Sequence, residues 1–284
     1  IDVELNFSNP FIVSLKNAST YVINCLNLAH KLMSEKKYKG VINCPINKRL
    51  LGVTSILGVT EFLASKCKIK DNSEVMMISN KNLSVAPLTT HLNVKNISKN
   101  ISSNLIIKKI TTINVEYKKI YRKLPKIGVL GLNPHNAELK KNSEEYQKII
   151  PALSKLKKKK INVHGPLVSD TVFISNYKKY DVIVGMYHDQ VLSPFKALFK
   201  FNAINITLGL TYMRVSPDHG PALDIVGKKK SNCFSLLQCI KFINTLKQWN
   251  MPKKSLGQNY LTDSNIIKKI INLKDIYNKN VIEI

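Results

Sequence analysis

Long hydrophobic runs are absent from this sequence, and so is a recognisable signal peptide. No segment approaches the roughly eighteen consecutive apolar residues that a membrane-spanning helix needs. The first residues, Ile1 to Glu4, have neither the basic nor the apolar region of a signal peptide. We therefore expect a globular protein of the cytoplasm that has no membrane partner.

Cysteine is also scarce. The five cysteines are far apart and form no CxxC motif; they are Cys25, Cys44, Cys67, Cys233 and Cys239. An odd number at these spacings argues against a disulfide framework and against a zinc knuckle. The pattern fits a reducing cytoplasm in which the thiols are structural.

Acidic residues are few: 18 Asp and Glu stand against 44 Lys and Arg, which gives a formal net charge of +26. Such a charge ordinarily indicates a nucleic-acid or anionic-surface partner. However, the excess is mainly lysine, and the chain is also rich in Asn and Ile, the trio that adenine- and thymine-rich codons produce. The run Lys157 to Lys160 ends a predicted helix, where cations suit the carbonyl end. We therefore assign most of the charge to composition, although the positive field would favour phosphorylated substrates.

Hydrophobic residues make up 44% of the 284 residues, which is enough for a large core. The apolar periodicity predicts helices at 18–35, through 149–156 and at 231–248, and strands at 41–44, 75–79, 83–88, 127–132, 182–186 and 203–208. The strands on either side of Asn80 to Asn82 form a predicted hairpin, and Asn142 with Glu145 is a predicted capping box. Helices that alternate with strands indicate an α/β fold with a largely parallel sheet.

Three histidines each follow a short apolar run of the kind that forms a buried strand. They are His91 in TTHL, His135 in GLNPH and His188 in MYHDQ. Open α/β sheets bind ligands at the carboxyl ends of their strands, and neutral imidazole is the commonest metal ligand. No two of these histidines have an HxxxH or HxH spacing, so the spacing alone also allows surface or hydrogen-bonded core roles.

The segments around these histidines carry a family resemblance. TTHL, GLNPH, GPLVSDTVF, MYHDQ, NITLGL, RVSPDHG and ALDIVGK follow one another between residues 89 and 228. In order and spacing they resemble the 4-hydroxythreonine-4-phosphate dehydrogenases of pyridoxal phosphate biosynthesis, over about residues 10 to 250. The resemblance implies a homodimer with shared active sites, whose subunits are three-layer α/β/α folds related to isocitrate and isopropylmalate dehydrogenases.

The same resemblance implies a reaction and its residues. The reaction is oxidation of 4-phosphooxy-L-threonine at C3 by NAD, followed by decarboxylation, with a divalent metal (Zn, Mg or Co) held by His91, His135 and His188. We expect His91 and His135 to share one cleft of a subunit, while His188 serves the partner's site. The family's substrate-binding residues match Thr60, Lys196, Asn205 and Arg214, and Lys196 is also the candidate for proton transfer. His219 and Gly220 match the loop that contacts the dinucleotide, and Asp189 either orients an imidazole or caps a helix.

Some positions depart from the family pattern. Val59 stands where the family has a histidine beside Thr60, so one polar substrate contact is absent. The segment from Cys44 to Lys48 also differs, Ala137 to Lys140 replace a glycine-rich stretch, and Pro221 replaces a threonine. An inactive remnant of the dehydrogenase is therefore one alternative to a working enzyme.

The two ends of the chain suggest a second alternative. The sequence starts without Met, and comparison with the family predicts that the first part of the subunit is missing. We expect residues 1–252 to form the dehydrogenase-like domain, because residues 253–284 resemble the start of the 16S rRNA adenine dimethyltransferases. There Asn259 and Leu261 match a segment that contacts S-adenosylmethionine, but the sequence ends before the glycine-rich loop. The other reading is thus a methyltransferase fusion or fragment. Nucleic acid would be its partner only if that enzyme is complete. A loosely docked tail would serve neither function.

Overall fold

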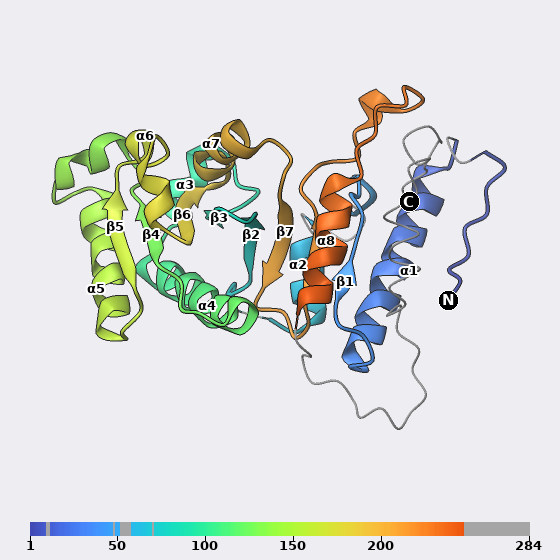
Figure 1. The fold of residues 1–284 in the computed structure, drawn as a ribbon, viewed down its shortest axis with the longest axis horizontal. Coiled ribbons are helices and arrows are strands. Elements are labelled where there is room, and N and C mark those ends of the chain that lie inside the picture. Colours follow the sequence, from blue (N-terminus) through green and yellow to red (C-terminus); the bar gives the residue numbers. More distant parts are fainter. Residues whose placement is uncertain (10–11, 48, 52–57, 70, 247–284) are drawn as a thin grey trace.

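The computed structural model describes residues 1–9, 12–47, 49–51, 58–69 and 71–246 (Figure 1). In this part of the chain, eight strands form one sheet in the order β1-β8-β7-β2-β3-β6-β4-β5. The strands are β1 (Val41–Ile42), β2 (Val75–Ser79), β3 (Ser84–Thr89), β4 (Ile127–Leu130), β5 (Val163–Leu167), β6 (Val182–Tyr187), β7 (Ile204–Leu208) and β8 (Arg214–Pro217). The helices are α1 (Leu15–Ser34), α2 (Val59–Lys66), α3 (Ile97–Asn100), α4 (Ser103–Tyr121), α5 (Ile150–Lys158), α6 (Ser169–Val172), α7 (His188–Phe199) and α8 (Phe234–Thr245).

The α/β class is confirmed, and the sheet is mixed. Neighbouring strands are parallel along β3-β6-β4-β5 and between β1 and β8. Antiparallel pairs join β2 to β3, β2 to β7 and β7 to β8. The predicted hairpin explains one of these reversals, because the Asn80 side chain accepts the backbone N–H groups of Asn82 and Leu83 at 2.8 and 2.9 Å and closes a short turn.

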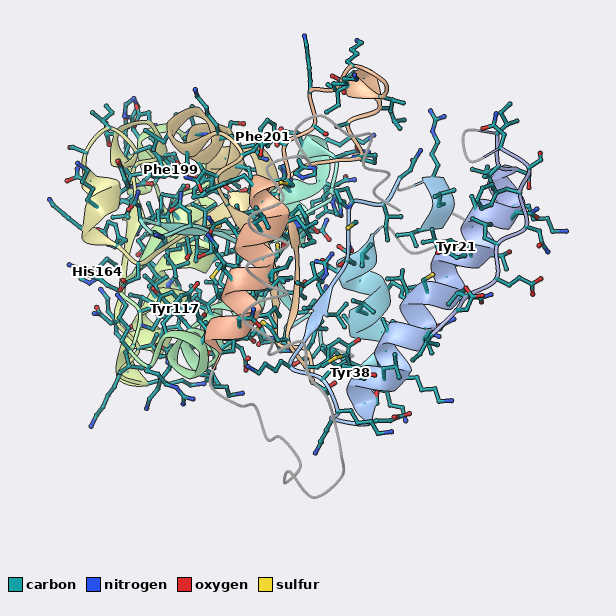
Figure 2. The ribbon with its side chains drawn as sticks, turned by 45° about the vertical axis from the view of Figure 1, so that its right-hand side comes forward. Tyr21, Tyr38, Tyr117, His164, Phe199 and Phe201 are labelled. Carbon is teal, nitrogen blue, oxygen red and sulfur yellow. The ribbon has the colours of Figure 1, made fainter. Side chains whose placement is uncertain are left out.

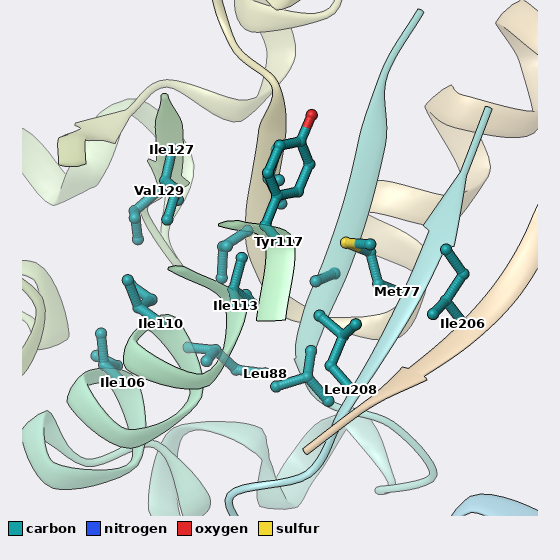
Figure 3. Close-up of a cluster of buried hydrophobic side chains, with 14 of the residues drawn as sticks. Met77, Leu88, Ile106, Ile110, Ile113, Tyr117, Ile127, Val129, Ile206 and Leu208 are labelled. Atoms are coloured by element: carbon teal, nitrogen blue, oxygen red, sulfur yellow. The ribbon is translucent and has the colours of Figure 1, made fainter. Parts of the chain in front are cut away.

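Helices cover both faces of the sheet and make it the middle of three layers. Residues alternate between the faces along each strand: Met77 and Val75 face α4, whereas Met76 and Ile78 face α7. The larger cluster brings together side chains of α4, α5 and α8 with the strands, and Figure 3 shows its α4 part against Met77 and Leu88. The smaller cluster on the other face includes residues of α6 and α7.

A third apolar cluster joins α1 and α2 at the β1 end of the sheet. Tyr21 on α1 therefore lies at the opposite end of the molecule from His164 on β5 (Figure 2). The helix predicted at 18–35 is confirmed with an earlier start, because the Ser14 hydroxyl accepts the N–H of Asn17 at 3.2 Å and caps α1. Within the described ranges, no helix has the length and apolar character needed to cross a bilayer.

The capping box predicted at Asn142 and Glu145 is wrong. Ser143 supplies the side-chain acceptor, for the N–H of Tyr146 at 3.3 Å, and one π-helical turn (Glu145–Ile149) leads into α5. Glu145 is fully buried, and its carboxylate points to the loop after β4. A buried carboxylate needs several donors, and that loop offers more of them than a helix start would.

Candidate active site

The three predicted metal ligands follow three neighbouring strands. Because β3, β6 and β4 are adjacent and parallel, their carboxyl ends meet at one edge of the sheet. His91 comes just after β3, His188 opens α7 directly after β6, and His135 lies in the loop after β4. The rings of His91 and His188 are 6.4 Å apart between centroids. The strand order therefore places the three loops at the same edge of the sheet. Of the three histidines, His91 and His188 have side chains in contact range of each other.

His91 faces a carboxylate that the sequence analysis missed. Its Nδ1 lies 3.4 Å from Oε1 of Glu61, and the same oxygen accepts a hydrogen bond from the Thr90 hydroxyl at 3.2 Å. Burial opposes ionisation of Glu61, but the contacts from His91 and Thr90 outweigh it and hold the pKa of this carboxyl below its usual range. The available signal was its position, one residue after the predicted substrate ligand Thr60 in the first turn of α2.

His188 faces a carboxylate as well. Its Nδ1 lies 2.6 Å from Oδ1 of Asp189, whereas no side chain caps α7. Of the two roles considered for Asp189, the contact favours orienting an imidazole. The next residue, Gln190, fastens two strand ends: its amide oxygen accepts the N–H of Met186 at 2.7 Å, and its amide nitrogen donates to Gly131 O at 2.7 Å and to Ser169 Oγ at 2.8 Å.

The segment that carries His135 has an unusual backbone. The φ angles from His135 to Leu139 all lie between 48° and 56°, in the left-handed region that favours glycine. This is where the family resemblance predicted a glycine-rich stretch. His135 itself is exposed, and no group of three or more potential metal ligands forms among the residues described here. The pair within one subunit is His91 with His188, so the contribution of His135 and the sharing of ligands between subunits stay predictions.

Glu145 holds the first part of the same loop. Its Oε1 accepts the N–H groups of Leu132 and Asn133 at 2.7 and 2.8 Å, and its Oε2 accepts the Asn133 amide at 3.0 Å. Burial opposes ionisation, yet these hydrogen bonds keep the pKa of Glu145 below its usual range. The adjacent Glu144 accepts the Asn133 amide too, at 2.9 Å. Asn133 in the GLNPH segment is therefore fixed on three sides.

Asn205 and Arg214 share a polar face on β7 and β8. Thr207 pairs with Arg214 and Asn205 with Ser216, so alternate residues put these four side chains on one face. Arg214 is only 3% exposed; its Nε donates to Asn43 Oδ1 at 2.6 Å and its Nη1 to Thr207 Oγ1 at 3.0 Å. Burial lowers the pKa of Arg214 to about 10, so the guanidinium stays charged at neutral pH.

No carboxylate contacts Arg214 in the described chain, and its hydrogen bonds go to a neutral amide and a hydroxyl. The Asn205 side-chain oxygen is buried and also lacks a hydrogen-bond partner there. Asn43 and Thr207 were not predicted from the sequence. Thr207 had a signal, because it is two residues from Asn205 along a predicted strand.

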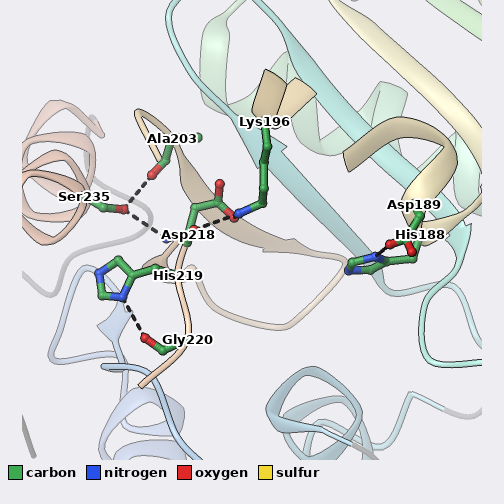
Figure 4. Close-up of polar contacts among 8 residues, drawn as sticks. All are labelled: His188, Asp189, Lys196, Ala203, Asp218, His219, Gly220 and Ser235. Atoms are coloured by element: carbon green, nitrogen blue, oxygen red, sulfur yellow. Dashed lines mark hydrogen bonds and ion pairs between the residues drawn. The ribbon is translucent and has the colours of Figure 1, made fainter. Parts of the chain in front are cut away.

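Lys196 lies in an ion pair beside this face (Figure 4). Its Nζ is 3.1 Å from Asp218 Oδ1 and 3.0 Å from the Asp218 carbonyl oxygen, and it lies 4.7 Å above the Phe201 ring. Burial raises the pKa of Asp218, against the opposing charges of Lys196, His219 and His188. Ser235 accepts the Asp218 N–H at 3.0 Å, which anchors the backbone of Asp218. The pair holds the Lys196 ammonium in one place.

The loop after Asp218 offers free groups to a dinucleotide. No heavy atom lies within 4 Å of the point where a Gly220 side chain would begin, so the loop presents bare backbone. His219 Nδ1 contacts the Gly220 carbonyl at 2.9 Å, while its buried Nε2 has no partner in the described structure. These features fit the predicted NAD contact. The predicted S-adenosylmethionine residues Asn259 and Leu261 lie outside the described residues.

Thr60 and Val59 open α2 side by side. Thr60 is half-buried and is followed directly by the Glu61 that contacts His91. Val59 packs against the α1 and α2 cluster that contains Leu26 and Phe62. Val59, which replaces the family's histidine, therefore adds to the apolar cluster. Thr60 remains as the polar side chain that this segment offers to a substrate.

The fold has three α/β layers and places imidazoles at strand ends, beside a buried guanidinium and a fixed ammonium. This arrangement is typical of a metal-assisted enzyme that acts on an anionic small molecule. Comparison with known families agrees with this class. Residues 3–243 match the family described as "Pyridoxal phosphate biosynthetic protein PdxA", and the chain belongs to that family. The family resemblance of the sequence motifs is thereby confirmed. The match does not extend to residues 253–284, whose resemblance to a methyltransferase stays a prediction.

Individual relatives cover most of the chain. The 4-hydroxythreonine-4-phosphate dehydrogenase of Sulfurihydrogenibium sp. is 36% identical over 251 residues, which are 87% of this chain and 76% of that protein. A putative D-threonate 4-phosphate dehydrogenase of Oceanobacillus iheyensis is 38% identical over 220 residues, 76% of this chain and 66% of that protein. The crystal structure of the Klebsiella pneumoniae 4-hydroxythreonine-4-phosphate dehydrogenase has a TM-score of 0.71 at 30% identity, over 82% of this chain and 72% of that one.

Proposed function

We propose that this protein oxidises 4-phosphooxy-L-threonine at C3 with NAD and a divalent metal, as a step of pyridoxal 5'-phosphate biosynthesis. A hydride leaves C3 for NAD and the hydroxyl proton is released. The resulting β-keto acid then loses its carboxylate as carbon dioxide, and C2 takes up a proton. Family membership supports the reaction class. The observation that carries the proposal is the buried guanidinium of Arg214, which has only neutral partners in the described chain.

A buried charge is costly unless an opposite charge offsets it. Asn43 and Thr207 satisfy two guanidinium donors but supply no negative charge. A phosphate group would supply that charge, and a planar guanidinium matches phosphate geometry. Asn205, on the same face of β7, adds a side-chain amide whose N–H groups can donate to phosphate oxygens. This face therefore supports recognition of a phosphorylated substrate.

The imidazoles of His91 and His188 fit a metal because a carboxylate faces Nδ1 of each ring, which leaves Nε2 available as a ligand. We propose that they hold the ion together with His135. The ion, when bound, supplies Lewis-acid withdrawal of charge from the substrate oxygen at C3. Lys196, fixed by Asp218, is the group that can transfer a proton beside the phosphate-binding face. His219 and Gly220 would contact NAD, the hydride acceptor.

The assembly and compartment belong to the same proposal. We propose a homodimer in which the partner subunit completes the set of three histidines, because the described part of one subunit brings His91 and His188 together and places no third potential ligand with them. We also propose the cytoplasm as its compartment and residues 1–252 as the dehydrogenase-like unit. Sedimentation velocity with and without Zn²⁺ tests the assembly, since a chain that stays monomeric under both conditions would contradict it.

The activity test follows NADH formation with 4-phosphooxy-L-threonine and Zn²⁺, Mg²⁺ or Co²⁺. D-threonate 4-phosphate is the comparison substrate, because a relative of similar identity has a name that refers to it. We expect metal-dependent NADH formation that is faster with the amino acid and is abolished by a chelator. Turnover of D-threonate 4-phosphate alone would change the proposed substrate. The absence of turnover with either compound and every metal would favour the inactive remnant.

A further inference from the structure

Glu61 is a half-buried carboxylate that takes no direct part in the proposed reaction. It lies in the first turn of α2, next to the apolar cluster of α1, yet its side chain reaches the carboxyl end of β3. There it accepts the Thr90 hydroxyl at 3.2 Å and lies 3.4 Å from Nδ1 of His91. The residue thus joins two parts of the fold at the first predicted metal ligand.

The chain leaves room for this contact. The residue before α2 is Gly58, and a Cβ atom there would come within 2.7 Å of Glu61 Oε2 and 3.4 Å of His91 Cε1. The backbone of Gly58 is extended, with φ at −171°, a conformation that any residue adopts. A side chain at this position would therefore displace the Glu61 carboxylate, and glycine leaves the space that Glu61 and His91 use.

The two side chains also need each other. In the part of the chain that the structure describes, Nδ1 of His91 and Oε2 of Glu61 are both buried without a hydrogen-bond partner. The 3.4 Å contact is within ion-pair range but lacks hydrogen-bond alignment, so a small rotation of either side chain would satisfy both groups. Buried polar atoms rarely stay unpaired, and a carboxylate facing a ring nitrogen is the common outer partner of a metal-binding imidazole.

We infer that Glu61 is a positioning residue for His91: it holds the proton of the imidazole on Nδ1 and directs Nε2 toward the metal. The inference rests on the metal site of the proposed function. Asp189 has the same relation to His188 at 2.6 Å, but its side chain is 76% exposed and adjacent in sequence. Glu61 comes from another element, so it also fixes α2 against the end of β3.

Two substitutions separate the effects of Glu61. Glu61→Met keeps much of the side-chain volume and helix propensity but removes the acceptor, whereas Glu61→Gln keeps an amide oxygen that can still accept from Nδ1. The control is Glu35→Met on the far end of α1, where the Glu35 side chain is 34% exposed and forms an ion pair with Lys37. Circular dichroism verifies that each variant is folded.

The first measurement is the Zn²⁺ dissociation constant of the full chain, from competition with a chromophoric chelator. We expect Glu61→Met to weaken Zn²⁺ binding by about 10- to 100-fold, which is the usual effect of losing such a partner, and Glu61→Gln by less. Glu35→Met should bind as the wild type does. Equal affinities for the wild type and both Glu61 variants would overturn the inference. If Glu61→Met does not fold, the ring tautomer of His91 in the wild type decides the inference.

The second measurement needs no metal. Nitrogen chemical shifts of ¹⁵N-labelled histidine in the metal-free protein report which ring nitrogen of His91 carries the proton, with a His91→Gln variant for assignment. We expect Nδ1–H in the wild type and in Glu61→Gln, and a mixture of tautomers in Glu61→Met. A wild type that binds no metal would contradict the proposed function, while the tautomer would still decide the role of Glu61. An Nε2–H tautomer in the wild type would refute that role.

Discussion

Replacing Ala137 with glycine should stabilise the protein, although glycine usually weakens a fold. Ala137 lies in the middle of the left-handed segment His135–Leu139, with φ at 48° and ψ at 29°. This conformation costs an L-residue roughly 1–2 kcal/mol, and glycine adopts it without that cost. The greater freedom of glycine in the unfolded chain offsets about 0.5–1 kcal/mol of the gain. We expect the free energy of unfolding to rise by about 0.5–1 kcal/mol.

The matched control is Ala197→Gly. Ala197 is exposed inside α7, where glycine in place of alanine costs about 1 kcal/mol. Urea denaturation gives both free energies from the transition midpoint and slope. The two variants should move in opposite directions and differ by roughly 1.5–2 kcal/mol. If Ala137→Gly destabilises the protein as much as Ala197→Gly does, the segment is not left-handed in solution and the reasoning is refuted.

Three further predictions concern buried or half-buried groups. Arg214→Met should lower kcat/KM for the phosphorylated substrate by about 10- to 150-fold, which is the effect of losing a hydrogen bond to a charged group. An unchanged kcat/KM would exclude phosphate binding at Arg214. Glu145→Gln should lower the free energy of unfolding by about 1–3 kcal/mol, because its amide would turn a donor toward the Asn133 amide; a urea midpoint equal to the wild type would contradict this. Burial, aided by the charge of Lys66, lowers the pKa of His30 in the folded protein. As the pH drops below about 6.5, His30 is therefore protonated in the unfolded chain before it is protonated in the folded one, and the free energy of unfolding falls. In His30→Gln, which can still contact Tyr212, the decline measured by urea titration at several pH values should be smaller.

Local patterns in the sequence predicted most of the strands, but only three of the eight α-helices in the described chain, α1, α5 and α8. The apolar stripe of α1, the hairpin around Asn80 and the strands that precede the three histidines all depend on residues close together in the chain. The antiparallel pairing of β7 with β2 could not be read in this way, because it joins segments more than a hundred residues apart. The parallel half of the sheet was predicted since helices separate its strands.

The candidate site was predictable where a motif named its residues. Glu61 and Glu145 were missed because their partners lie far away in the sequence or in another element, and a carboxylate in a helix start is usually a capping residue. The backbone at His135 was not predictable either, since the residues from Asn136 to Leu139 include only Asn as one that readily adopts positive φ. The pairing of His91 with His188 followed from strand order, which the sequence does not contain.

The Gln190 amide has a consequence for which substitutions the site tolerates. Its oxygen accepts one backbone N–H, and its nitrogen donates to a carbonyl and to a hydroxyl, so the orientation of the amide is determined by its surroundings. Glutamate has almost the same shape, but it would turn an oxygen toward the carbonyl of Gly131. Hydrolysis of this single amide during ageing of the protein would therefore remove the side-chain link between the chain just after β4 and the end of β6, next to the loops that carry His135 and His188.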